Sequence, residues 1–109
     1  MADHPQWPVT KMSIEQMREF ADAGAYLSLY WVAAVANFHN PWVDPLEVVE
    51  IIQTVSIDSL VGGTDLTQPG NPDPVAGLRQ FMEMLLAMGV STEAVRTIFA
   101  RNPAKLIYG

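Results

Sequence analysis

Apolar residues at helical spacing mark the first element of the chain. Ser13 and Gln16 match a capping box, in which each side chain bonds to the free backbone amide of the other residue. Apolar side chains then recur on one helical face, and this stripe comprises Met17, Phe20 and Ala21. Gly24 suits the position after the helix, because glycine adopts the left-handed conformation that closes it. The pattern predicts a helix between Ser13 and Gly24.

The stretch from Ala25 to Val35 has a different pattern. Its sequence, AYLSLYWVAAV, is almost entirely apolar, with aromatic residues at the centre. A strand that is buried on both faces has this composition, and such strands belong to parallel sheets. Periodicity alone does not separate a buried strand from a buried helix over so short a run. A small all-α protein with a buried helix over residues 25–38 is therefore the alternative.

Helical spacing returns after a polar loop. Asp44, Pro45 and Glu47 provide an N-cap, a first-turn proline and a capping-box acid for a second helix. Its predicted buried side comprises Val48, Val49, Ile51, Ile52 and Val55. The segment Ile57–Gly63, IDSLVGG, predicts a second strand, and Thr64–Asp73, with its prolines and glycine, predicts a long loop. Loops of that length usually have a functional role.

Two further helices are predicted in the C-terminal third. Asp73-Pro74 begins the first, and Gly89 ends it. Its predicted buried side comprises Leu78, Phe81, Met82, Leu85 and Leu86. Ser91 begins the second, and its predicted buried side comprises Val95, Ile98 and Phe99. Asn102-Pro103 begins a last helical turn.

The predicted order along the chain is helix, strand, helix, strand, helix, helix, in a single domain over residues 1–109. Residues 1–12 contain Pro5 and Pro8 and show no periodicity, so they predict a loop. The connections between the strands are long enough for parallel crossovers. The sequence therefore predicts an α/β fold with parallel strands and flanking helices, and no strand ahead of the first helix.

Composition and charge exclude several classes of partner. The 109 residues include 6 basic and 12 acidic side chains, which gives a net charge of −6. The basic residues are scattered from Lys11 to Lys105, so the chain lacks the basic stripe that binds nucleic acid or an anionic membrane. No apolar run reaches the roughly 18 residues that span a bilayer, and the N-terminus lacks a signal-peptide pattern. Without cysteine there are no disulfides or thiolate zinc sites, and we expect a cytoplasmic chain.

Three polar residues lie where β/α chains gather their functional groups, two of them after the predicted strands and one, His4, where the end of a missing strand would lie. His4 precedes the first helix, His39 follows the apolar strand, and Asp65 follows the second strand. Two imidazoles and a carboxylate suit zinc or a similar divalent ion, and a carboxylate beside a metal-bound water can take its proton. By spacing alone, simpler roles are favoured: a solvated His4, a His39 bonded to backbone, and an Asp65 that caps its turn.

Two longer motifs carry a family resemblance. Residues 63–79, GTDLTQPGNPDPVAGLR, precede an amphipathic helix, and residues 91–106 have the sequence STEAVRTIFARNPAKL. Together they resemble the C-terminal end of a metal-dependent hydrolase of the amidohydrolase superfamily. In that superfamily the last barrel strand ends in an aspartate, and a segment of the type NPA(K/R)L closes the barrel. The sequence HPQWP at residues 4–8 is similar to the end of an earlier strand that delivers a metal-binding histidine.

The resemblance implies a partial (β/α)₈ barrel, made of the last three βα units, with a metal centre that activates water. Asp65 would match the last-strand aspartate, as metal ligand or general base, and His4 would match the sixth-strand histidine, with that strand missing ahead of it. His39 matches no family ligand. The ligands of the first, fourth and fifth strands are absent, and a catalytic zinc needs about three protein ligands. The resemblance therefore implies a truncated fragment with an incomplete metal site, whose hydrolysis of a small-molecule substrate is absent or weak.

A non-catalytic module is the alternative function. A small parallel sheet with open edges and an uncovered face would pair with a second copy or another partner, so we expect a homo-oligomer. Trp31, Phe38 and Trp42 either anchor such a contact or pack in the core, and core packing is the favoured role. A response to zinc or manganese separates the two functions, because only the hydrolase has a reason to bind a metal.

Overall fold

The fold is that of a computed structural model, which describes residues 2–3, 12–30, 44–64 and 73–109. The strands are β1 (Ala2–Asp3), β2 (Leu27–Tyr30) and β3 (Leu60–Gly63). The α-helices are α1 (Ile14–Asp22), α2 (Pro45–Thr54), α3 (Pro74–Ala87), α4 (Thr92–Arg96) and α5 (Asn102–Tyr108). A 3₁₀ turn, η2 (Ile57–Ser59), precedes β3, and a π turn, η3 (Thr97–Arg101), follows α4. Strands alternate with helices up to α3, so the α/β prediction is confirmed.

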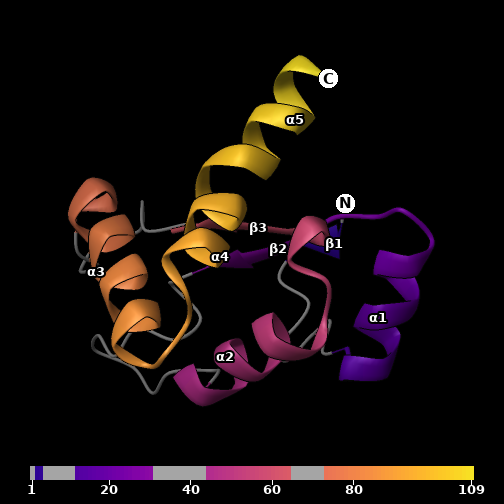
Figure 1. Ribbon diagram of the computed structural model, residues 1–109, viewed down its shortest axis with the longest axis horizontal. Helices are drawn as coiled ribbons and strands as arrows, with labels where there is room; N and C mark the ends of the chain where they lie inside the picture. Colours follow the sequence, from indigo (N-terminus) through magenta and orange to yellow (C-terminus); the bar gives the residue numbers. More distant parts are fainter. Residues whose placement is uncertain (1, 4–11, 31–43, 65–72) are drawn as a thin grey trace.

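The three strands form one parallel sheet in the order β1-β2-β3 (Figure 1). Two rows cross all three strands: Ala2 with Leu27 and Leu60, and Asp3 with Ser28 and Val61. β2 and β3 continue for two further rows, and the last row pairs Tyr30 with Gly63. Because all the strands run in one direction, their carboxyl ends lie at the same edge of the sheet.

The central strand β2 is buried on both faces. Leu27 and Leu29 belong to the hydrophobic core, and Ser28, which alternates with them, is 2% exposed. Val61, beside Ser28 on β3, is 7% exposed and lies outside the core cluster. The predicted strand is therefore confirmed over Leu27–Tyr30, and the all-α alternative is wrong. The face that we expected to be uncovered is closed at Ser28 and Val61 within a single chain.

Helices enclose the core on the face of the sheet to which Leu27 and Leu29 point. Four of them begin at side-chain caps that the sequence predicts: Ser13 for α1, Asp44 for α2, Asp73 for α3 and Ser91 for α4. Each cap accepts a backbone N–H of the first turn at 2.9 to 3.1 Å, which satisfies a donor that has no partner inside the helix. All five residues that the sequence predicts for the buried side of α2 are buried. The largest core side chains from the helical elements are Met17, Ile51, Phe81, Leu85 and Ile98.

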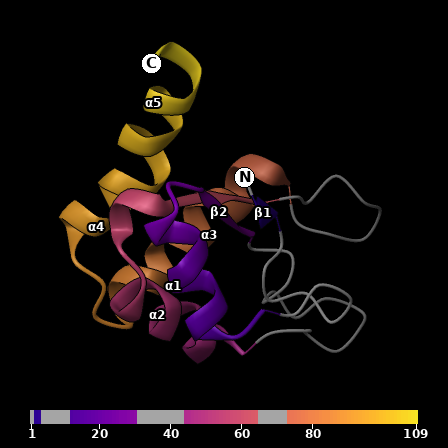
Figure 2. The same cartoon turned by 90° about the vertical axis from the view of Figure 1, so that its right-hand side faces the viewer.

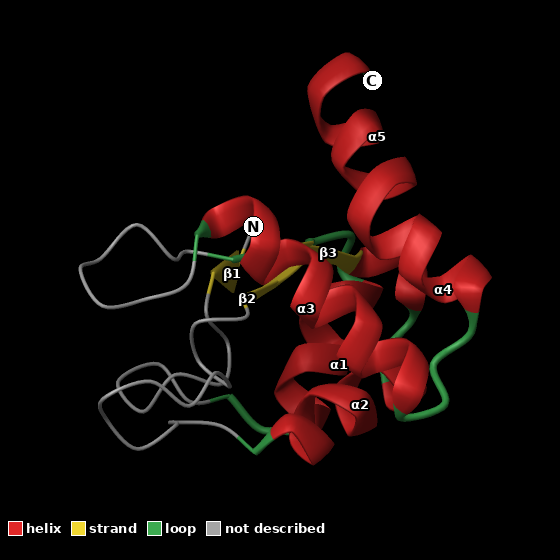
Figure 3. Ribbon diagram, turned by 90° about the vertical axis from the view of Figure 1, so that its left-hand side faces the viewer, coloured by secondary structure: helices red, strands yellow, loops and turns green. Residues whose placement is uncertain are grey.

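The elements α4, η3 and α5 join into one helical segment from Thr92 to Tyr108 (Figure 3). At η3 the backbone N–H of Asn102 donates to the carbonyl of Thr97, five residues back instead of four. Pro103 follows directly and has no N–H to donate. The segment continues as α5, which extends away from the rest of the molecule (Figures 1 and 2). Among the described residues, no helix combines the length and apolar content needed to cross a membrane.

Three local predictions are wrong. Ala2–Asp3 forms β1 instead of a loop, because two residues paired through their backbone show no periodicity in sequence. Ile57–Ser59 forms a 3₁₀ turn, so β3 begins only at Leu60. Phe20 and Leu86, predicted on buried helical faces, are 48% and 42% exposed. An apolar stripe identifies a helical face, but the neighbouring elements decide how much of it they cover.

The strand β3 and the C-terminal helical segment are in close contact at Gly62. An ideal Cβ placed on Gly62 would lie 2.6 Å from Cζ and 2.8 Å from Cδ1 of the Phe99 ring. Real Cβ atoms do not come so close to a neighbour, so only glycine lets η3 lie this near the strand. Phe99 in turn packs edge-on against Phe81 of α3, with ring centroids 5.2 Å apart.

We predict that Gly62→Ala lowers the free energy of unfolding by about 1–3 kcal/mol, because the added methyl group overlaps the Phe99 ring. Urea denaturation followed by circular dichroism measures the change. In Gly62→Ala/Phe99→Leu the smaller side chain leaves room for the methyl group, so the loss should be less than the sum of the single losses. Strictly additive losses would show that the two residues do not meet in solution.

Candidate functional site

The carboxyl ends of the three strands lie at one edge of the sheet, where parallel α/β proteins place their functional groups. β1 ends at Asp3, β2 at Tyr30 and β3 at Gly63. The chain continues from these ends, through Thr64 after β3, into segments outside the described residues, namely 4–11, 31–43 and 65–72. Those segments contain all the candidate ligands that the sequence predicts, His4, His39 and Asp65. The aromatic residues Trp31, Phe38 and Trp42 also lie outside the described residues.

The ends of β1 and β3 fix the points from which the chain continues toward His4 and Asp65. His4 follows Asp3 directly, and Asp65 is two residues beyond Gly63. The ends of β1 and β3 are two strands and two rows apart, which corresponds to about 12 Å at the usual strand spacing and rise. The sheet therefore brings both chain segments to one edge. His4 and Asp65 themselves lie outside the described residues.

Tyr30 and Gly63 close the described part of this edge. An ideal Cβ on Gly63 would lie 3.0 Å from Cε1 and 3.2 Å from Cδ1 of Tyr30, so the tyrosine ring lies directly over the glycine. Because side chains alternate along a strand, Tyr30 shares its face with Ser28, opposite the face of Leu29 in the core. The face away from the core thus presents a tyrosine ring at the end where the candidate segments begin.

The part of the chain that the structure describes contains no group of three or more His, Cys, Asp or Glu side chains that could hold a metal ion. A catalytic zinc needs about three protein ligands. A metal site at this edge would therefore draw ligands from the segments that follow the strands.

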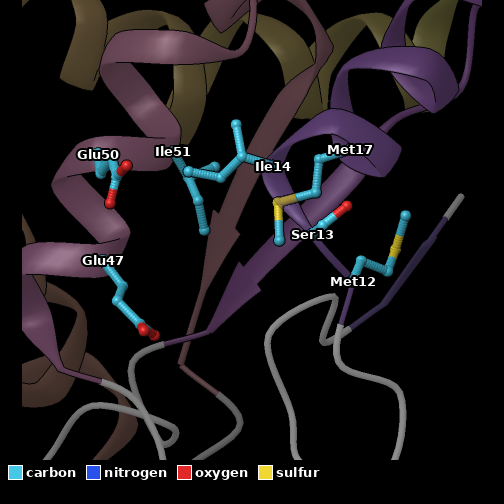
Figure 4. Close-up of a pocket in the computed structure, with 7 residues that line it drawn as sticks. All are labelled: Met12, Ser13, Ile14, Met17, Glu47, Glu50 and Ile51. Carbon is cyan, nitrogen blue, oxygen red and sulfur yellow. The ribbon is translucent and has the colours of Figure 1, made fainter.

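A small pocket of about 160 Å³ lies between α1 and α2 (Figure 4). Its lining combines four apolar side chains, Met12, Ile14, Met17 and Ile51, with three polar ones, Ser13, Glu47 and Glu50. Met17 and Ile51 are each 2% exposed, so the floor of the pocket is the hydrophobic core itself. Small-molecule sites usually measure about 300–1,000 Å³, so this pocket has room for one side chain and not for a substrate.

A wider hollow of about 520 Å³ lies beside α5, and its lining includes Asp58, Arg101, Lys105 and Tyr108. Arg101 forms an ion pair with Glu93 at 3.2 Å, and both side chains are more than half exposed. An exposed pair of this kind contributes at most about 1 kcal/mol, because water screens it. The hollow offers charged groups to solvent, without the enclosure that acid–base chemistry uses.

Asn102 has a role that the sequence analysis missed. Its side chain is 2% exposed, and its Nδ2 donates to the carbonyls of Ile57 and Leu60, each at 2.7 Å. One amide therefore ties the C-terminal helical segment to the amino end of β3. The signal was present in the spacing, since Asn102 lies on the helical face of Val95 and Ile98, and a polar side chain on a core face needs a partner.

Comparison with known proteins gives no match. The sequence fits no family model, and no curated protein and no solved structure matches it. The resemblance to the amidohydrolase superfamily therefore stays a prediction that depends on Asp65, His4 and the closing segment NPAKL.

We predict that Asn102→Leu lowers the free energy of unfolding by about 2–4 kcal/mol, because two carbonyl groups lose their side-chain donor. Asn102→Asp keeps the shape but places a carboxylate beside the same carbonyls, so it should cost at least as much. Urea unfolding measures both variants, and the exposed Gln80→Leu serves as a control with an expected change below about 0.5 kcal/mol. An Asn102→Asp chain as stable as the control would contradict the anchoring role.

Proposed function

We propose that this chain contributes the last three βα units of a metal-dependent hydrolase barrel of the amidohydrolase type. The observation that carries the proposal is the shared edge at which β1, β2 and β3 end, since His4 and Asp65 follow β1 and β3 in the chain. The alternation β1, α1, β2, α2, β3, α3 with parallel pairing is the repeat from which (β/α)₈ barrels are built.

His4 and Asp65 are, in this proposal, two ligands of a divalent metal such as zinc. The metal supplies activation of a water molecule for the hydrolysis of a small-molecule substrate. Asp65 would be the carboxylate that accepts the proton of the attacking water. Two ligands are fewer than the about three that a catalytic zinc needs, so His4 and Asp65 alone make an incomplete site. The chain by itself should therefore bind metal weakly and hydrolyse little.

The two faces of the sheet set a requirement on His4. If β1 continued by one residue, His4 would join the row of Leu29 and Gly62. The side chains of that row face the helices. The alternation of β3 leads position 65 to the opposite face. The proposal therefore requires the chain to leave the line of β1 after Asp3, where the strand ends.

We expect Asp65→Asn and His4→Gln each to weaken zinc binding at least tenfold, because even the loss of an outer-shell partner costs about 10–100-fold in metal affinity. Isothermal titration of the full chain with zinc measures the affinity, and elemental analysis after gel filtration measures the bound metal. Asp58→Asn removes an exposed carboxylate at the other end of β3 and should leave binding unchanged.

The hydrolase proposal fails if the full chain binds neither zinc nor manganese, or if Asp65→Asn and His4→Gln bind zinc as tightly as Asp58→Asn. His39→Gln is informative in addition, since His39 matches no family ligand and its loss should not affect the affinity.

A non-catalytic, self-associating module is the second candidate function, and exposed apolar side chains at the end of α5 favour it. Leu106, Ile107 and Tyr108 are 41%, 72% and 86% exposed. β3 is also an edge strand of the described sheet, and strand edges pair readily with other chains. A homo-oligomer of this kind has no reason to respond to zinc or manganese. A chain without cysteine suits the reducing cytoplasm, where we place either function.

A further inference from the structure

The end of α5 is an apolar tip that the described chain leaves uncovered. The tip comprises Leu106, Ile107 and Tyr108, of which Tyr108 is 86% exposed. Figures 1 and 3 show that α5 extends away from the sheet and from α1, α2 and α3. Large apolar side chains gathered at a projecting end are typical of contact sites, whereas apolar side chains exposed singly are ordinary.

The charge of the C-terminal helical segment is opposite to that of the rest of the molecule. Residues 92–108 contain three basic residues and one acidic residue, a net charge of +2. The helices α1 and α2 contain one basic residue and five acidic residues, a net charge of −4. Complementary charge favours contact between these two parts of neighbouring molecules and speeds their encounter.

The pocket between α1 and α2 complements the α5 tip in chemistry and size. Figure 4 shows Ile14, Met17 and Ile51 between the two helices, with the carboxylates of Glu47 and Glu50 along α2. Methionine side chains adapt their shape to an inserted group, which suits Met17 and Met12 to this role. The volume of about 160 Å³ has room for a single large side chain.

We propose that the α5 tip of one copy of this chain docks into the α1–α2 pocket of a second copy. Tyr108 enters the apolar pocket, since aromatic side chains are frequent anchors of protein contacts. Lys105 lies three residues earlier on the same side of the helix and meets Glu50 at the rim of the pocket.

The contact is between copies because α5 extends away from α1 and α2, the helices that line the pocket (Figures 1 and 2). It joins two different surfaces, so after one contact the pair keeps one free tip, on one copy, and one free pocket, on the other. Such head-to-tail contacts build rings when the rotation closes and open chains when it does not. The inference identifies the contact of the self-associating module and does not depend on the metal proposal.

Charge reversal tests the contact. Tyr108→Ala should raise the dissociation constant at least about tenfold, as expected for a buried anchor. Lys105→Glu and Glu50→Lys should each weaken association, and the double variant Lys105→Glu/Glu50→Lys should restore it, because the attraction between the two charges returns with opposite sign. Sedimentation equilibrium of the full chain measures each dissociation constant, and urea unfolding checks that every variant is folded.

Mixing two deficient variants tests the head-to-tail geometry. Tyr108→Asp lacks a functional tip, and Met12→Lys/Glu50→Lys lacks a functional pocket, so each should be monomeric alone. Mixed together, they should form a one-to-one heterodimer and nothing larger, since only one tip and one matching pocket remain. Val75→Asp is the control for Tyr108→Asp, because it also places a carboxylate at an exposed apolar position, Val75 being 74% and Tyr108 86% exposed. Val75 lies on α3, away from the tip, so this change should not alter association.

The proposal is overturned if the unchanged chain is monomeric at high concentration, or if Tyr108→Asp associates as strongly as Val75→Asp. Association through sheet edges would give the second result. Zinc titration of Tyr108→Asp keeps the two proposals apart, because loss of the tip should leave the metal affinity of the chain unchanged.

Discussion

The amide of Asn102 is the interaction on which the arrangement of this fold depends. By donating to the carbonyls of Ile57 and Leu60, it holds the C-terminal helical segment against the start of β3. A second contact, Phe99 on Gly62, lies one helical turn earlier and two strand residues further along. A helix rises about 4.5 Å over three residues and a strand about 6.6 Å over two, so the two contacts can be made together. The helix consequently runs back along β3, opposite to the strand, as crossover helices do in parallel α/β folds.

This arrangement separates the parts of the sheet that provide stability from those available for chemistry. The amino end of β3 is held by Asn102 and the turn η2, and the paired core residues Leu27 and Leu60 are fully buried. The carboxyl edge is where the chain leaves the strands for the segments that contain the candidate ligands. In β/α barrels, too, the amino ends of the strands serve stability and the carboxyl ends serve function. Substitutions at the amino end of β3 should therefore change stability, and those at the carboxyl edge should change binding or activity.

The sequence predicts the helices well because their starts depend on local chemistry. Ser13, Asp44, Asp73 and Ser91 cap helices through hydrogen bonds within four residues, and such bonds can be identified without the rest of the structure. β1 depends instead on pairing with the distant strand β2, and η2 is a single turn of three residues, so neither is long enough to leave a periodic signal. For the candidate site, the sequence could place His4 and Asp65 after strands, but not relate them in space, because that relation depends on register and on where β1 ends. Asn102 was predicted as a helical position only, since its partners are more than forty residues away.

The π turn at η3 has a consequence for how this region can vary in length. Successive residues of an α-helix are turned by about 100°, so adding or removing one residue between Ser91 and Asn102 would swing the Asn102 amide away from the carbonyls of Ile57 and Leu60. The hydrogen bond from Asn102 to Thr97 already spans one residue more than an α-helical bond does. This wider turn ends at Asn102, just before Pro103. Homologous chains should therefore differ freely in the side chains of the exposed face of this segment while keeping its residue count constant.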